Sequence, residues 1–260
     1  MSEASPLLEF FKRGEVARDV RLLAAQGTLA PRANEQLEIL VLLLEDPDAE
    51  IRQVADATLN RIPIEALQTF LGRSDVSIGL REFFGDRGVF PAEIPKIEVD
   101  VDVPLIDAAP LEFGADDEAE EEDRESVMTR LSQMSFPERL KAAMKGTKEE
   151  RAALIRDPNK LVSVSVLSSP KLSESEVVNF TKMGNVSEEI LRLIGMNRSW
   201  TKNYAVISGL AKNPKTPLAV SMRFIQRLNE KDLKFISLDR NLQEALKALA
   251  RKRLRGDDKE

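Results

Sequence analysis

Helix-start signals recur along the second half of this chain, and they constrain its fold more than any other feature. A residue that can cap a helix stands three positions before a glutamate in four places: Ser135 and Glu138, Thr147 and Glu150, Ser173 and Glu176, and Asn185 and Glu188. In such a capping box the two side chains satisfy free backbone N–H groups at the start of a helix. We therefore expect helices to begin near residues 136, 148, 174 and 186.

The first 88 residues carry apolar side chains at helical spacing, for example at Leu37, Leu40, Val41 and Leu44. Within this region, residues 40–60 join an apolar helix, an Asp-Pro turn, an acidic first turn and a second amphipathic helix. This stretch resembles a HEAT repeat, the helical-hairpin unit of α-solenoid proteins. The resemblance implies stacked pairs of helices that bury their apolar faces between neighbours.

A turn of similar form recurs at 155–161, 194–200 and 236–242, at spacings of 39 and 42 residues. Periods near 40 are typical of HEAT and armadillo arrays. The runs Arg-Asp-Pro-Asn-Lys-Leu (156–161) and Asn-Pro-Lys-Thr-Pro (213–217) are also similar to a group of bacterial helical-repeat proteins, which implies that fold and no particular activity. The sequence predicts an all-α, HEAT/armadillo-like fold with about six helices before residue 88 and about ten after residue 124.

Charge divides the chain into three parts. Residues 1–88 carry a net charge of −5, residues 89–123 carry −12 and residues 124–260 carry +11, within a total of −6. We therefore expect an N-terminal HEAT-like helical module at 1–88, an acidic, proline-containing linker at 89–123 and a basic helical-repeat module at 124–260. The opposite charges of linker and basic module favour an intramolecular contact between them.

Within the linker, residues 97–103 alternate apolar and acidic side chains, which is the period of a β-strand. One interpretation is an acidic spacer without regular structure. The other is a recognition segment that adds a strand to the sheet edge of a partner.

The 260 residues include no Cys and no His. This composition excludes thiolate and imidazole metal sites, disulfides and His-dependent nucleophilic catalysis. We expect no metal, no cofactor and no enzymatic activity; the enzyme alternative, a HEAT-like DNA glycosylase, needs an acid beside aromatic residues in a basic cleft. No apolar run is long enough to cross a bilayer and no signal-peptide pattern is present, so we expect a cytoplasmic protein without membrane insertion.

The chain has one Trp and one Tyr, at Trp200 and Tyr204, beside cationic and amide side chains. On one continuous helix these two residues share a face, which either fills the core of a repeat or forms a docking surface. A weak resemblance to the Trp and Asn side chains of armadillo peptide grooves favours docking, although the spacing to Asn203 is three rather than four. The predicted partner-binding residues are Arg192, Arg198, Trp200, Lys202, Asn203, Tyr204, Lys212 and Lys215.

The expected function is a non-catalytic scaffold or adaptor that binds proteins through its helical repeats. The alternative is a nucleic-acid-binding protein in which the basic C-terminal module neutralises phosphates and the acidic linker competes with them.

Overall fold

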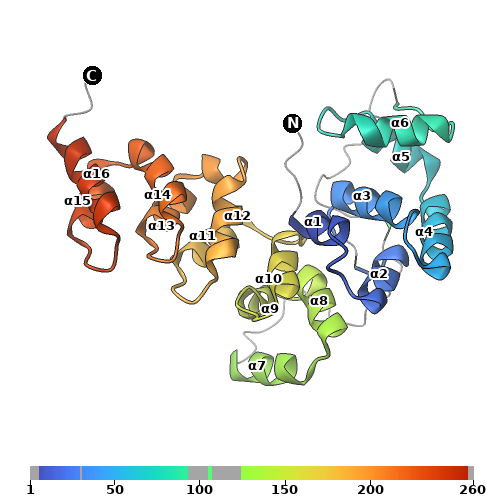
Figure 1. Ribbon diagram of the computed structural model, residues 1–260, viewed down its shortest axis with the longest axis horizontal. Coiled ribbons are helices and arrows are strands. Elements are labelled where there is room, and N and C mark those ends of the chain that lie inside the picture. Colours follow the sequence, from blue (N-terminus) through green and yellow to red (C-terminus); the bar gives the residue numbers. More distant parts are fainter. Residues whose placement is uncertain (1–5, 30, 93–104, 107–123, 257–260) are drawn as a thin grey trace. The chain divides into compact units, whose positions relative to one another are not determined.

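The structure is a computed structural model that describes residues 6–29, 31–92, 105–106 and 124–256 (Figure 1). Every regular element in these residues is a helix, with six α-helices before residue 88 and ten after residue 123. The predicted all-α fold class is therefore confirmed for the described residues. Packing divides the chain into two compact units, residues 1–171 and residues 172–260, which we call unit 1 and unit 2.

The described part of unit 1 contains ten α-helices: α1 (Pro6–Lys12), α2 (Arg18–Ala25), α3 (Ala33–Leu43), α4 (Ala49–Arg61), α5 (Ile64–Leu71), α6 (Ile78–Asp86), α7 (Arg124–Gln133), α8 (Phe136–Lys145), α9 (Lys148–Leu154) and α10 (Lys160–Leu167). Helix α3 packs against α1, α2 and α4, while α10 packs against both α8 and α1. One apolar core results, and it includes Leu7 of α1, Leu40 of α3, Leu140 and Met144 of α8 and Leu161 of α10.

The boundary drawn from charge differs from the boundary set by packing. Helices α7 to α10 belong to unit 1, although their charge places them in the basic C-terminal part. Charge depends on exposed side chains, whereas a compact unit is defined by buried apolar contacts such as those of Leu140 and Leu161 with the core of α1 to α6. Of the linker at 89–123, residues 93–104 and 107–123 lie outside the described residues, and so does the whole segment 97–103.

The described part of unit 2 contains six α-helices and two 3₁₀-helices: α11 (Glu174–Lys182), α12 (Glu188–Met196), η1 (Trp200–Lys202), α13 (Tyr204–Lys212), α14 (Leu218–Phe224), η2 (Ile225–Arg227), α15 (Glu230–Leu238) and α16 (Glu244–Arg255). They form three hairpins in series, α11–α12, α13–α14 and α15–α16, with α11, α13 and α15 in one layer and α12, α14 and α16 in the other (Figure 1).

The hairpins of unit 2 recur at a shorter interval than the sequence repeat suggests. Helices α11, α13 and α15 begin at residues 174, 204 and 230, so successive hairpins begin 30 and 26 residues apart. The similar turns at 155–161, 194–200 and 236–242 are 39 and 42 residues apart, and each interval spans three helices. The second and third of these turns lead into α13 and α16, which lie in different layers, so the interval is not that of the hairpins.

A common hydrogen bond shapes the turns between helices. Asp46, Asp157, Asn213 and Asp239 each accept the backbone N–H two residues ahead, at 2.8–3.0 Å. The predicted capping boxes are present at the starts of α8, α9 and α11. The fourth start differs, because Ser187 rather than Asn185 caps α12 by accepting the N–H of Ile190.

Two glycines allow neighbouring hairpins to approach closely, one in each layer. A Cβ atom on Gly209 of α13 would overlap Oγ1 of Thr181 on α11 and lie 2.9 Å from its Cβ. A Cβ atom on Gly195 of α12 would lie 2.5 Å from Val220 of α14. The side chain of Asn213 adds two hydrogen bonds to backbone carbonyls at the end of α11, at 2.8 and 2.9 Å. These contacts fix the spacing between the first hairpin, α11–α12, and the second, α13–α14.

Candidate partner-binding surface on unit 2

The aromatic pair does not lie on one continuous helix, contrary to the prediction. Trp200 lies in η1, whereas Tyr204 is the first residue of α13. Between them Asn203 has an extended backbone (φ −74°, ψ 122°), and its side chain accepts the N–H of Ala205 at 2.9 Å. An asparagine that captures a free N–H in this way favours a new helix start over continuation. Trp200 is partly buried and Tyr204 is exposed.

Four of the basic residues predicted to bind a partner lie in separate parts of unit 2: Arg192, Arg198, Lys202 and Lys215. Arg192 lies on α12 and pairs with Glu189 at 2.6 Å. Arg198 and Lys202 are exposed at and before η1, and Lys215 is exposed in the turn after α13. Asn203, besides capping α13, donates from its amide to Glu174 at the start of α11, at 3.1 Å.

Two predicted residues, Tyr204 and Lys212, meet at a carboxylate that the sequence analysis missed. Asp232, in the first turn of α15, is 8% exposed and accepts Tyr204 Oη at 2.5 Å, Ser208 Oγ at 2.8 Å and Lys212 Nζ at 2.7 Å. The three donors follow one another at intervals of four residues, so one face of α13 presents all of them. We call these four residues the Asp232 cluster.

A sequence signal for Asp232 does exist. Asn229 stands three residues before it, and its side chain accepts the backbone N–H of Asp232 at 2.8 Å, so that Asn229 caps α15. The spacing is the same as in the capping boxes, but with Asp in place of Glu. This pattern locates Asp232 in the first turn of a helix, and it does not reveal the partners on α13.

The hydrogen bonds of the cluster keep the Asp232 carboxyl charged at neutral pH. Burial disfavours the charged form of Asp232, but hydrogen bonds from Lys212, Tyr204 and Ser208 and the charge of Lys212 outweigh it, so the pKa of the carboxyl lies below its ordinary value. Burial, followed by the hydrogen bond to Asp232, raises the pKa of Tyr204. The cluster is therefore an ion pair completed by two neutral hydroxyl donors.

Two exposed aromatic rings lie at the Asp232 cluster. Tyr204 is 41% exposed although its hydroxyl is bound, and Phe235, three residues after Asp232 on α15, is 52% exposed. Lys212 Nζ lies 5.3 Å from the centroid of the Phe235 ring, within cation–π range. We call Tyr204, Lys212 and Phe235 the α13–α15 surface. Exposed aromatic side chains on a fixed support are typical of the residues that dominate binding at interfaces.

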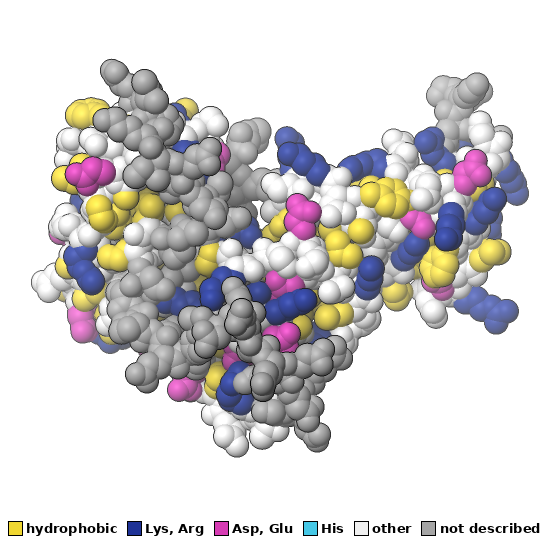
Figure 2. Space-filling view, turned by 180° about the vertical axis from the view of Figure 1, so that it is seen from behind, with side chains coloured by type: hydrophobic (Ala, Val, Ile, Leu, Met, Phe, Trp, Pro, Cys, Tyr) yellow, Lys and Arg dark blue, Asp and Glu magenta, His cyan; other side chains and the backbone are white. Residues whose placement is uncertain are grey.

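Basic side chains outnumber acidic ones on unit 2. Residues 172–260 contain 17 Lys and Arg and 11 Asp and Glu, and Figure 2 shows Lys and Arg (dark blue) distributed along one face of the unit. Arg253 of α16 donates to the backbone carbonyl of Gln226 at 3.2 Å, which joins the basic end of α16 to η2. This excess of positive charge attracts anionic partners.

Comparison of the chain with protein-family models, with curated proteins and with solved structures found no match. Within the residues that the structure describes, no group of three or more His, Cys, Asp or Glu side chains could hold a metal ion. No helix in that part of the chain is long and apolar enough to span a membrane.

Proposed function

We propose that the chain is a non-catalytic scaffold or adaptor with HEAT-like helical repeats that binds a protein partner through the α13–α15 surface. The observation that carries this proposal is a pair of exposed rings beside one buried carboxylate: Asp232 binds the hydroxyl of Tyr204, and the Phe235 ring lies next to Lys212, which Asp232 also binds. Ordering a side chain on association costs about 0.5–1.5 kcal/mol. The Tyr204 ring, whose hydroxyl is already bound in the free protein, avoids part of this cost.

The arrangement of unit 2 supports the repeat class. Its hairpins stack in two layers, Asx turns recur between helices, and close contacts at Gly195 and Gly209 set the spacing in both layers. Stacked hairpins of this kind present an extended ridged surface, which suits the binding of another protein. The excess of Lys and Arg over Asp and Glu in unit 2 favours an acidic partner, with apolar side chains that cover the two rings.

Replacement of one exposed ring tests the proposal. We expect Phe235→Ser in the full chain to lower the affinity for at least one bound protein by about tenfold or more, the loss of a contact worth about 1.4 kcal/mol. The measurement is quantitative mass spectrometry of proteins retained by the immobilised chain, followed by titration of the purified partner. Circular dichroism verifies that the variant is folded.

Phe90→Ser is the matched control, because Phe90 is an aromatic residue of unit 1 with 63% exposure. It makes the same change in chemistry away from the α13–α15 surface and should leave the retained protein unchanged. If both variants lose the same affinity for the retained protein, or if Phe235→Ser loses none, the proposed surface is contradicted.

A second function, nucleic-acid binding, is favoured by the basic end of unit 2. Arg227 of η2 and Lys252, Arg253 and Arg255 of α16 are all exposed. Phosphate contacts by such residues release counterions, so the affinity falls steeply between about 50 and 200 mM salt. Fluorescence anisotropy with labelled RNA and DNA at both salt concentrations measures this. An absence of binding at the lower concentration eliminates this function.

A further inference from the structure

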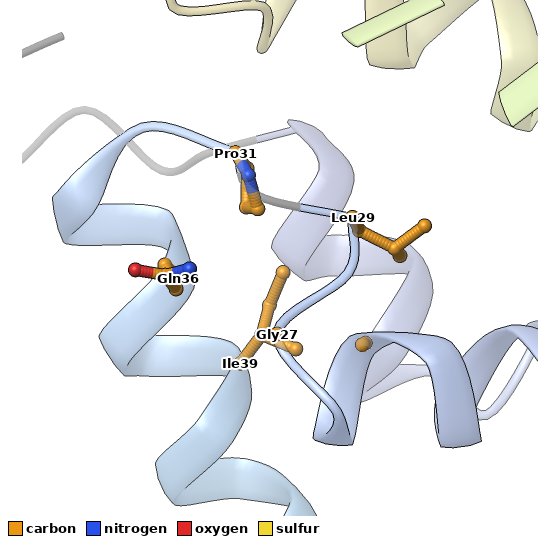
Figure 3. Close-up of a pocket in the computed structure, with 6 residues that line it drawn as sticks. Gly27, Leu29, Pro31, Gln36 and Ile39 are labelled. Carbon is orange, nitrogen blue, oxygen red and sulfur yellow. The ribbon is translucent and has the colours of Figure 1, made fainter. Parts of the chain in front are cut away.

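A hollow in unit 1 is too small to take a side chain of a partner. The residues that line it are Ala24, Gly27, Leu29, Pro31, Gln36 and Ile39 (Figure 3). It has room for about one water molecule, and Gln36 already binds the backbone of Leu105 and Ile106. An exposed helix face of unit 2 offers a partner more area than this hollow does.

That face belongs to α15, one side of which carries two large apolar side chains that solvent reaches. Phe235 is 52% exposed and Leu238 is 80% exposed. The buried side of the helix consists of Asp232, Leu233, Ile236 and Ser237. On the other side Lys231, Phe235 and Leu238 follow one another at intervals of four and three residues, so they form one line along the helix. We call these three residues the α15 ridge.

The α15 ridge continues the α13–α15 surface along the helix. The hydroxyl of Tyr204 accepts the backbone N–H of Asn229, the cap of α15, at 3.2 Å. Phe235 lies farther along, beside Lys212, and Leu238 is the last residue of α15. The nine residues of this helix extend about 13 Å at 1.5 Å per residue. A row of this length suits the groove between two rows of side chains on another helix.

Positive charge borders the α15 ridge without a matching negative charge. Lys234 lies 4.0 Å from Glu230, so these two charges balance each other. Lys231 is exposed, and so is Arg240 in the turn that follows α15. Neither of them pairs with a carboxylate in the part of the chain that the structure describes. Both cations therefore attract acidic side chains of a partner.

We propose that the α15 ridge binds an acidic amphipathic helix of a partner protein. Apolar side chains on one face of that helix cover Phe235 and Leu238, and its Asp or Glu residues meet Lys231 and Arg240. Removal of the apolar side chains from water supplies affinity, whereas the charges select the helix, because a basic one would bring like charges together. The inference rests on the proposed function, to which it adds the chemistry and the secondary structure of the partner.

A library of displayed helical peptides, randomised on one face, serves as the probe. The immobilised full chain selects peptides, and the Leu238→Ser chain removes those that bind elsewhere. We expect the remaining peptides to be enriched in Leu, Ile or Phe at spacings of three and four residues and in Asp and Glu beside them. Enrichment in Lys and Arg overturns the inference, and so does the absence of any peptide that distinguishes the two chains.

The strongest selected peptide is then titrated by fluorescence anisotropy at about 150 mM salt, where charges more than about 8 Å apart are screened. We expect Leu238→Ser and Lys231→Glu each to weaken binding by about tenfold or more. The matched control is Lys182→Glu, an equal change of charge at an exposed residue of α11, which α13 separates from α15. It should change the affinity by less than about twofold. Equal effects of the two charge reversals overturn the inference.

A lipid surface is the other ligand that suits an apolar ridge bordered by cations. Sedimentation of the full chain with phosphatidylglycerol vesicles, compared with phosphatidylcholine vesicles, tests it. If the chain sediments with the anionic vesicles and Leu238→Ser abolishes this, the ridge binds membranes and the inference is overturned.

Failure of the inference differs from failure of the proposed function. If Phe235→Ser releases a retained protein and Lys231→Glu does not, the proposed function stands and the acidic helix is wrong. If Phe235→Ser releases no protein, the proposed function itself fails.

Discussion

The buried carboxylate of Asp232 joins α15 to α13 by binding Tyr204, Ser208 and Lys212, and it holds the hydroxyl of the exposed Tyr204 ring. Tyr204 and Lys212 could be selected from the sequence, because one is the only tyrosine and the other stands in a basic region. Their shared partner could not be selected in this way. Asp232 lies 28 residues from Tyr204 and 20 from Lys212, and local patterns do not encode pairs across such separations.

Replacement of Asp232 by asparagine should destabilise unit 2. Asp232→Asn removes the charge that faces Lys212, so we expect the free energy of unfolding to fall by about 1.5–3 kcal/mol, the range for hydrogen bonds to charged groups. Urea denaturation followed by the fluorescence of Trp200 measures this. Glu230→Gln is the control, since Glu230 lies on the same helical turn with its side chain 85% exposed. It should change stability by less than about 0.5 kcal/mol, and equal effects of the two substitutions contradict the role of Asp232.

The lowered pKa of Asp232 gives its contribution a pH dependence. A carboxyl group with a lower pKa in the folded state binds protons more readily when unfolded, so acid favours unfolding. The contribution is complete above the ordinary value of 3.8 and is lost as the pH falls through the lower pKa of the folded protein. We expect the stability difference between the unaltered chain and Asp232→Asn to be constant from about pH 7 to pH 5 and to shrink below about pH 4. A difference that persists undiminished at pH 2 contradicts this.

Helix starts could be predicted well because capping is local. The starts of α8, α9 and α11 agree with the boxes at Ser135, Thr147 and Ser173. The helix expected through Trp200 and Tyr204 was wrong because the cap at Asn203 begins a new helix. Which helices pack together depends on contacts between distant residues, and the sequence spacing of similar turns did not show it.

The contact between α11 and α13 should tolerate no side chain at Gly209. Alanine has a better helix propensity than glycine by about 1 kcal/mol, but overpacking against Thr181 costs about 1–3 kcal/mol. We expect Gly209→Ala to lower the free energy of unfolding of unit 2 by about 1 kcal/mol net, measured by urea denaturation. Gly184→Ala is the control, because a Cβ there meets no atom within 4 Å. A Gly209→Ala variant as stable as the unaltered chain contradicts the close approach.

A double-mutant cycle assigns this cost to Thr181. In Thr181→Ala the overlapping Oγ1 is absent, so Gly209→Ala should cost less in that background. We expect a coupling of about 0.5 kcal/mol or more between the two sites. Strict additivity would place the cost elsewhere in α13.

At the scale of the whole chain, charge and packing divide the molecule differently. The net charge of the sequence changes sign near residue 124, whereas the boundary between the compact units falls between residues 171 and 172. Helix α8 carries three basic residues and one acidic residue, yet its apolar residues, with Leu161 of α10, complete the core of α1 to α6. The net charge of a segment does not distinguish exposed from buried residues. It could therefore predict two helical regions, but not which helices stabilise each other.

A core substitution in α8 decides which boundary governs unfolding. Leu140 is fully buried in the apolar core that also includes residues of α1, α3 and α10, and Leu140→Ala should cost about 2–5 kcal/mol. Hydrogen exchange resolved by helix is the measurement, because amides of one cooperative unit lose protection together. We expect exchange to accelerate throughout α1 to α10 and to stay unchanged in α11 to α16.

Ile190→Ala, at a fully buried position of α12, should show the reverse pattern. If residue 124 were the boundary, Leu140→Ala would leave α1 to α6 protected and expose α7 to α16, and that pattern would refute the assignment of α8 to unit 1.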